Sequence, residues 1–215
     1  MRWTGRPQGH LGRPDAVSSD TEIQSRRRAI NPLPWSWLRQ VHGAEVVTVG
    51  EPGQHAGTEA DALVTGCPDA VLAVFTADCA PVAFVSEEGI IGLAHAGWRG
   101  VVLGVIGRTV EVMRAMGATQ VLAALGPCIR AGCYEFGKAD LDVVVGQLGD
   151  GVRKTTTWGS PALDLAEAVR QSVASAGAEL VLDAGACTAC SSAWFSFRAN
   201  RDSARQATVV WRPGS

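Results

Sequence analysis

Two histidines and a cysteine, each beside small residues, are the strongest candidates for chemistry in this sequence of 215 residues. They are His42 in RQVHGAE, Cys79 in TADCAPVAF and His95 in GLAHAGWRG, and each is expected at the end of an apolar strand. Strand ends present side chains to a cleft from a rigid backbone. Two imidazoles and one thiolate suit zinc and leave a fourth position open to water. Because no local metal motif joins them, satisfied histidines and a buried apolar cysteine remain the alternative.

The segment after His95 adds a feature that favours anions. Its apolar spacing predicts a helix over 98–116, which Gly117 ends. Free N–H groups and the positive end of the helix dipole lie in the first turn of a helix. Arg99 falls in that turn, so we expect it to bind phosphate, and a thiolate at Cys79 is favoured as well.

The alternative for Arg99 is an ion pair with a carboxylate such as Asp61 or Asp78. Asp78 directly precedes Cys79, and from this position we expect it to transfer protons during catalysis. With Cys79 and Arg99, it completes the predicted catalytic set.

Four other cysteines could form a separate structural zinc site. Cys187 and Cys190 stand in CTAC, while Cys128 and Cys133 have a spacing at the edge of the usual range. In a reducing compartment, cysteines are expected to be thiols, catalytic groups or metal ligands rather than disulfides. We predict that these four do not bind a metal together.

The composition argues against several classes of function. The chain has 19 basic and 21 acidic residues, a net charge of -2 and 47% apolar residues. No basic excess indicates a nucleic-acid or membrane-surface partner. The start has no apolar signal-peptide region, and no apolar run approaches the ~20 residues that span a bilayer. We therefore expect a cytoplasmic protein.

The hydrophobic pattern predicts one α/β domain, or α+β with mixed sheets. Segment 1–34 is rich in Arg, Gly, Pro and Ser and is expected to be mostly irregular. A second helix is predicted in DLAEAVRQSVASAG, with Asp164 as its N-cap. Strands are predicted in SWLRQVHGAEVVTVG with a break at Gly43, at 70–76, 81–86 and 89–94, and in VLAALGPCI, ELVLDAG, WFSFRA and ATVVWR.

Several of these motifs together resemble one known family. They are RQVHGAEV, ADALVT, TADCAPVAF, HAGWRG, LGPCIRAGCYEFG, LDLAEAVR and FSFRANRDSARQATVVW. In this order, over roughly 37–211, the chain is similar to the laccase-domain or YfiH-like family, and the separation of TADC and HAGWRG is highly specific. Members are described as purine nucleoside phosphorylases and formerly as multicopper polyphenol oxidases.

The resemblance implies a single catalytic domain over 1–215, with a shortened N-terminal part at 1–34. It implies one zinc ion on His42, Cys79 and His95, the trio reached above. Substrate contacts are expected from Gln40, Asp61 and Arg198, in three of the matching segments. RPQGHLG is expected to correspond to a glycine-rich motif that helps to wall the substrate pocket.

The implied reactions are phosphorolysis of adenosine, inosine and methylthioadenosine, and deamination of adenosine to inosine, with purine nucleosides and phosphate as partners. A zinc-bound water suits attack at purine C6. Four histidines are too few for a multicopper centre, although copper in vitro could occupy the zinc site and give a polyphenol oxidase side activity. The fold is shared with CNF-type cysteine hydrolases. A metal-free hydrolase or amidase with a Cys79 nucleophile, acting on a cell-wall precursor peptide, is therefore the alternative.

Overall fold

The computed structural model describes residues 1–13 and 18–214, and the strands in this part form two mixed sheets and a hairpin. The small sheet has the order β1-β13-β6-β2-β4, the large sheet has the order β12-β9-β7-β8-β5-β3, and β10 pairs with β11. The strands are β1 Arg2–Trp3, β2 Trp35–Arg39, β3 Val46–Thr48, β4 Thr58–Glu59, β5 Ala62–Thr65, β6 Val71–Thr76, β7 Ala80–Val85, β8 Ile91–Ala96, β9 Leu122–Leu125, β10 Arg153–Thr155, β11 Pro161–Leu163, β12 Glu179–Asp183 and β13 Gln206–Trp211.

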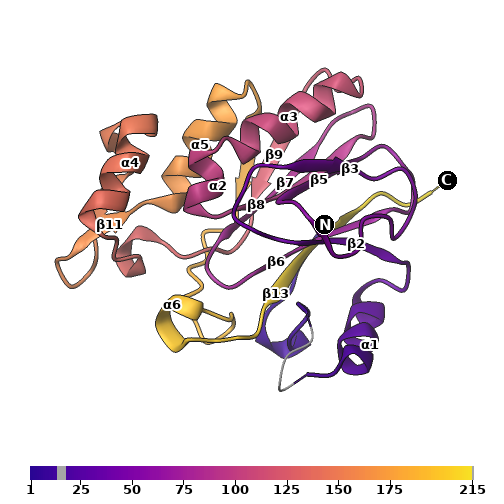
Figure 1. Cartoon of the computed structure of the whole chain (residues 1–215), viewed down its shortest axis with the longest axis horizontal. Coiled ribbons are helices and arrows are strands. Elements are labelled where there is room, and N and C mark those ends of the chain that lie inside the picture. Colours follow the sequence, from indigo (N-terminus) through magenta and orange to yellow (C-terminus); the bar gives the residue numbers. More distant parts are fainter. Residues whose placement is uncertain (14–17, 215) are drawn as a thin grey trace.

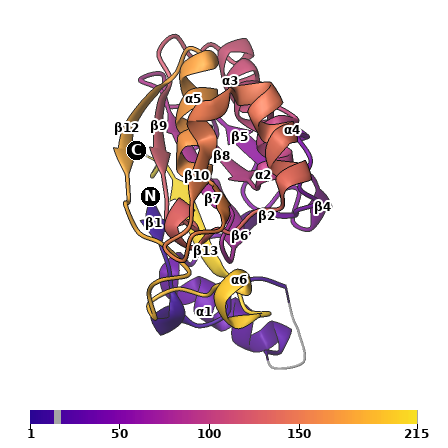
Figure 2. The same cartoon turned by 90° about the vertical axis from the view of Figure 1, so that its left-hand side faces the viewer.

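Helices cover the outer faces of both sheets. They are α1 Asp20–Ile30, α2 Trp98–Val102, α3 Val105–Ala115, α4 Lys138–Leu148, α5 Leu165–Ser175 and α6 Phe197–Asn200, with short 3-10 helices η1 Arg6–Gln8, η2 Ala131–Cys133 and η3 Asp150–Val152. Helices α2, α3 and α5 lie on one face of the large sheet, and the small sheet packs on its other face (Figure 1). Turned by a quarter, the molecule shows α1 and α6 together at the opposite end from α3 (Figure 2).

Three apolar cores among the described residues follow from this layering, and the smallest lies on the small sheet around Trp35 and Phe75. The larger one joins α3 and α5 to the large sheet through fully buried residues such as Phe84, Ile106 and Met113. The second lies between the two sheets and includes Leu72 and Leu93. Because both faces of the large sheet are covered, its central strands are apolar throughout, which explains the continuous apolar runs in the sequence.

The predicted helix over 98–116 is divided in two. Gly104 has φ +85°, a left-handed conformation that ends α2 and precedes α3. The prediction of a strand in WFSFRA is wrong, because residues 197–200 form α6. Ser196 caps this helix by accepting a hydrogen bond from the Ala199 N–H. The other predicted strands and the α5 helix are confirmed, and the Asp164 side chain accepts from the Glu167 N–H as its N-cap.

The prediction of a mostly irregular segment at 1–34 needs a correction for α1. The sequence SDTE forms a capping box, in which Ser19 and Glu22 bond each other's backbone N–H. Arg27, in the last turn of this helix, is buried and stacks over the Trp37 and Phe75 rings of the small sheet. Arg27, within the sequence SRRR at 25–28, therefore packs the N-terminal segment against the small sheet. Residues 14–17 of it lie outside the described part.

Within residues 1–13 and 18–214, no helix is both long enough and apolar enough to cross a bilayer.

Candidate active site

His42, Cys79 and His95 come together where two interior strands of the large sheet, β7 and β8, begin and end. His95 is the next-to-last residue of the β8 strand, while Cys79 directly precedes β7. The antiparallel register pairs Pro81 with His95, so the start of β7 and the end of β8 are adjacent. His42 follows β2 in a loop and has φ +59°, which is unusual for a residue other than glycine. The trio thus comes from three segments, and Cys79 lies just before a strand, not at the end of one as expected.

The three donor atoms of this trio lie within 4.8 Å of one another. Cys79 Sγ is 3.8 Å from His42 Nε2, and the two imidazole rings meet edge to face with centroids 4.9 Å apart. His95 is buried, Cys79 is half-buried and His42 is exposed. A metal ion at this point would therefore have protein on one side and the solvent-accessible cavity on the other.

Gly97 of the HAGWRG segment lies so close to two of the donor residues that it has no room for a side chain. A Cβ atom at this position would lie 2.8 Å from His42 Cδ2 and 3.1 Å from Cys79 Sγ. A side chain here would displace two of the three donors. The glycine is therefore required by close approach.

The Asp61 carboxylate forms hydrogen bonds with the loop that carries His42 and with the His95 ring. Its carboxylate, which is fully buried, accepts hydrogen bonds from the N–H groups of residues 41, 42 and 43 at 3.2, 3.0 and 2.7 Å. The same carboxylate bonds His95 Nδ1 at 2.8 Å. Burial alone would raise the pKa of Asp61, but the bonds from His95 and the backbone keep it below its ordinary value. Asp61 thus orients the His42 loop and the His95 ring, while its expected contact with substrate stays a prediction.

The trio also tunes its own ionisation. Burial would raise the pKa of the Cys79 thiol, but the imidazoles of His95 and His42 lower it to about 6. Burial would lower the pKa of His95, whereas the Cys79 sulfur and the Asp61 carboxylate raise it to about 9. Without a metal, Cys79 and His95 therefore favour a thiolate–imidazolium pair at neutral pH.

Asp78 ties two distant loops to Cys79. It has φ +100°, and its carboxylate accepts from the Thr188 hydroxyl and from the Arg198 N–H, each at 2.7 Å. Each carboxylate oxygen thus has a partner that holds Asp78 in place, and proton transfer by Asp78 stays a prediction.

A cavity of about 510 Å³ opens over the trio and has a size usual for small-molecule sites. Its lining also includes aromatic and cationic side chains that were not among the predicted site residues, namely Phe75, Tyr134, Phe197, Arg39 and Arg205. Tyr134 follows Cys133 within LGPCIRAGCYEFG, and only its place in this family-like motif could have marked it as a cavity residue from the sequence.

Two expected contributors also border this cavity. Gln40 lies in the wall, but its amide exchanges two hydrogen bonds of 2.8 Å with the backbone of Phe75. His10 and Gly12 of RPQGHLG line it as well, together with Arg13, while the correspondence of this segment to a glycine-rich substrate motif stays a prediction. The N-terminal segment and the C-terminal Arg205 meet here through an Arg205 N–H bond to His10 Nδ1 of 2.9 Å.

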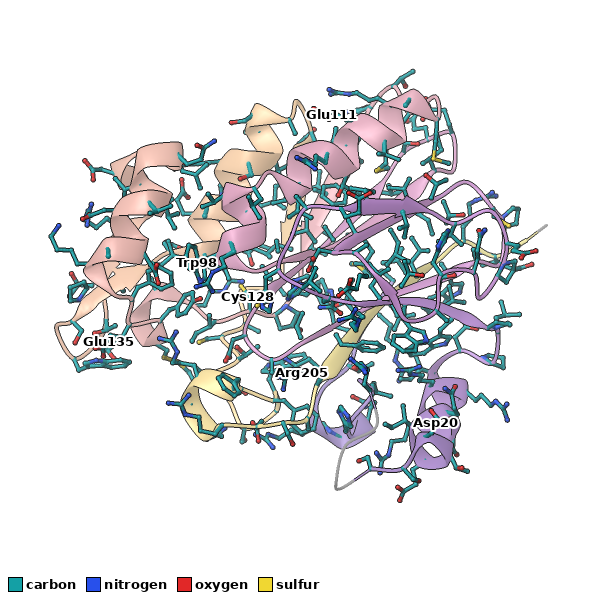
Figure 3. The ribbon with its side chains drawn as sticks, viewed as in Figure 1. Asp20, Trp98, Glu111, Cys128, Glu135 and Arg205 are labelled. Carbon is teal, nitrogen blue, oxygen red and sulfur yellow. A yellow bond between two sulfur atoms is a disulfide. The ribbon has the colours of Figure 1, made fainter. Side chains whose placement is uncertain are left out.

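Arg99 lies outside this cavity. It is exposed in the first turn of α2, with its guanidinium 4.2 Å from the centre of the Trp98 ring. It lines a second cavity of about 780 Å³, together with Trp98 and Glu135, both labelled in Figure 3. Arg198 lines both cavities and stacks 4.8 Å over Tyr134. Among the described residues, no carboxylate pairs with Arg99, so the predicted alternative of an ion pair with Asp61 or Asp78 is wrong.

The prediction that the cysteines are thiols holds for four of the six. Cys67, Cys79, Cys128 and Cys187 are free, but Cys133 and Cys190 form a disulfide. The reason is spatial, because η2 brings Cys133 beside the turn that carries CTAC, although the two lie far apart in the sequence. That these cysteines do not bind a metal together stays a prediction, because the sulfur atoms of Cys133, Cys187 and Cys190 lie within 4.8 Å of one another.

Known proteins resemble the chain over nearly its whole length. Residues 10–213 match the family model described as multi-copper polyphenol oxidoreductase laccase. The purine nucleoside phosphorylase ORF3 of Streptomyces griseus is 36% identical, with 98% of this chain and 91% of that protein covered. The purine nucleoside phosphorylase YfiH of Escherichia coli K12 is 34% identical, with 94% and 84% covered.

Solved structures share the fold. YlmD from Geobacillus stearothermophilus superposes with a TM-score of 0.81 at 30% identity, covering 95% of this chain and 85% of that one. The hypothetical protein YfiH of Bacillus licheniformis gives a TM-score of 0.85 at 25% identity, with 94% and 85% covered. The single mixed α/β domain described above is thus the architecture of these proteins.

Proposed function

The chain belongs to the multi-copper polyphenol oxidoreductase laccase family, and on that premise we propose that it is a zinc-dependent purine nucleoside enzyme. The proposed reactions are phosphorolysis of adenosine, inosine and methylthioadenosine to the base and a ribose or methylthioribose 1-phosphate, and deamination of adenosine to inosine. The names of its relatives support the phosphorolysis. The observation that carries the proposal is the convergence of His42, Cys79 and His95 in the floor of the main cavity.

The donor set of this trio fits zinc in kind and in number. Asp61 takes the Nδ1 side of His95, which leaves Nε2 as the donor, the carboxylate–histidine arrangement that supports many metal ligands. A lowered pKa keeps Cys79 in the thiolate form that binds metals. A zinc ion on these three donors would supply Lewis acidity and a bound water of lowered pKa.

The walls of the main cavity suit a nucleoside. Phe75, Tyr134 and Phe197 offer apolar and aromatic surface for a purine base. Arg205 and Gln40 supply polar groups at the rim, although the Gln40 amide is partly occupied by Phe75.

Phosphate is proposed to bind where the two cavities adjoin. Arg198 borders both of them, and Arg99 reaches the second cavity without a carboxylate partner among the described residues. The Arg198 guanidinium donates to the Glu135 carbonyl, which fixes its position over Tyr134. Asp78 binds the Arg198 N–H, so it aligns this arginine with Cys79.

Turnover of adenosine with and without phosphate tests the proposal, with the bases and nucleosides separated by chromatography. We expect adenine only with phosphate, inosine without it, one zinc per chain, and loss of both activities on chelation and in Cys79→Ser. Activity that survives complete removal of the metal would contradict the zinc dependence. Absence of both products from the zinc-loaded protein would contradict the substrate class.

A cysteine hydrolase is the second candidate, and the order Asp61–His95–Cys79 favours it. In that role Cys79 is the nucleophile, His95 the imidazole that takes up its proton to form the thiolate–imidazolium pair, and Asp61 the group that orients the imidazole. The substrate proposed for this activity is a cell-wall precursor peptide, in line with the expected kinship to CNF-type cysteine hydrolases. Amide hydrolysis by metal-free protein, together with modification of Cys79 by substrate-like electrophiles, distinguishes it from the zinc enzyme.

Copper is expected to bind the same three donors in vitro, because copper exceeds zinc in affinity for nitrogen and sulfur ligands. With four histidines in the chain, a multicopper centre cannot be assembled. Polyphenol oxidation is accordingly proposed as a side activity of copper-loaded protein, to be measured beside the zinc form.

A further inference from the structure

Three sulfur atoms meet beside the second cavity, outside the proposed metal site. Cys133 and Cys190 are joined in a disulfide, and the Sγ of Cys187 lies within 4.8 Å of both. A parallel β-bridge between Cys128 and Cys187 holds the third sulfur in place. Arg130 reinforces this contact, since its N–H donates to Cys187 Sγ at 3.4 Å and its guanidinium pairs with Asp183.

The fourth cysteine of this region is not equivalent to the other three. Cys128 is fully buried, and burial raises the pKa of its thiol to about 12, which makes it a poor nucleophile. Cys187 is half-buried, and its Sγ accepts the N–H bond from Arg130, so this sulfur is held beside the disulfide and is not sealed in the core. Cys133 borders the second cavity and Cys190 is exposed, so solvent reaches the disulfide.

We propose that Cys133, Cys187 and Cys190 form a thiol–disulfide exchange centre. The Cys187 thiolate attacks Cys190 Sγ, the Cys187–Cys190 bond forms, and the Cys133–Cys190 bond breaks. Cys187 gives up a proton and the released Cys133 takes one up. One disulfide is present before and after, so the step needs no oxidant or reductant.

The exchange changes how the wall of the main cavity is tethered. In the structure, the disulfide joins η2 to the turn that carries CTAC. Tyr134, next to Cys133, lines the main cavity, and Thr188, next to Cys187, bonds Asp78. Transfer of the bond to Cys187–Cys190 frees the Tyr134 segment and leaves the Thr188 turn closed on itself. This inference does not depend on the reaction proposed for the enzyme.

Disulfide mapping of the unreduced protein tests the centre, and the sequence makes the two forms easy to separate. Trypsin places Cys133 in peptide 131–138 and both Cys187 and Cys190 in peptide 171–198. The Cys133–Cys190 form therefore gives two linked peptides. The exchanged form gives an internal disulfide in 171–198 and an alkylated 131–138. Incubation at pH 8, followed by an acid quench and alkylation, should yield both forms.

Matched variants fix the assignment. Cys187→Ser should give only the linked peptides, and Cys133→Ser only the internal disulfide, while Cys67→Ser should leave the wild-type mixture unchanged. A single linkage in the wild type after prolonged incubation would overturn the proposal. So would a second zinc bound by the reduced wild type and lost in Cys187→Ser, because the cluster would then be a metal site.

Discussion

His95 Nδ1 lies 2.8 Å from Asp61 Oδ1, and both side chains are buried. The same carboxylate receives the backbone N–H of His42, so one buried group orients two of the three proposed ligands. Its bond fixes which nitrogen of His95 faces Cys79. The carboxylate therefore controls both the shape and the charge of the candidate site.

Asp61→Asn should weaken zinc binding. The variant keeps a hydrogen-bonding side chain of the same size, but it loses the charge that favours the Nδ1–H form of His95 and offers fewer acceptor sites for the loop N–H groups. Loss of such an outer partner typically costs about 10- to 100-fold in metal affinity. Competition with a chelator of known affinity measures the change. Asp20→Asn, on the exposed face of α1, is the control, and equal affinities in the two variants would contradict the role of Asp61.

In metal-free protein, Cys79 should react with iodoacetamide at unusually low pH. Its pKa is lowered from 9.0 to about 6, so the thiolate is present above about pH 6 and is lost as the pH falls through that value. His95, with a pKa raised to about 9, stays protonated over the interval between the two. The alkylation rate of the Cys79 peptide should thus be flat near neutral pH and fall below about pH 6.

Two further measurements test whether the imidazoles lower the pKa of Cys79. His95→Gln should move the midpoint upward, since the cation that stabilises the thiolate is gone, and bound zinc should protect Cys79 from alkylation. A wild-type midpoint near that of an ordinary thiol would show that the imidazoles do not lower the pKa.

Local sequence patterns predicted most of the strands because each buried strand of the large sheet is a short apolar run between turn residues. They also predicted the trio at His42, Cys79 and His95, since each has small neighbours that leave room for a ligand. The patterns failed where partners distant in sequence decide the structure. In WFSFRA the capping bond of Ser196 and the packing of the C-terminal segment override strand propensity.

The roles of the acidic residues could not be read from the sequence for the same reason. Asp61 has no local signature, and only the pairing of β5 with β8 places it beneath His95. Likewise, the link between Asp78 and Thr188 spans 110 residues. The disulfide between Cys133 and Cys190 depends on the positions of two loops, which no spacing rule fixes.

Arg99→Ala should affect phosphorolysis much more than deamination. The side chain is exposed, so its loss should leave the melting temperature nearly unchanged. A charge-assisted contact is worth roughly 1.5 to 3 kcal/mol, which raises the apparent KM for phosphate about 10- to 100-fold. Arg108→Ala, on the exposed side of α3, is the matched control. Equal losses of both activities, or unchanged phosphate saturation, would remove Arg99 from phosphate binding.

Gly97→Ala separates the geometry of the site from the stability of the fold. The added methyl group would lie 2.8 Å from His42 Cδ2 and 3.1 Å from Cys79 Sγ, so the donors must move apart. We expect a loss of zinc affinity and of all zinc-dependent turnover, even though the backbone of Gly97, with φ -72°, accepts alanine without strain.

Gly107→Ala is the contrasting substitution, because a Cβ atom there meets nothing within 4 Å and the residue lies inside α3. Alanine is favoured over glycine in a helix interior by about 0.8 to 1 kcal/mol, so this variant should be stabilised and fully active. Thermal unfolding and zinc titration of the two variants give the comparison. Full zinc affinity in Gly97→Ala would mean that the trio tolerates displacement, and its proposed role as a preorganised metal site would then fail.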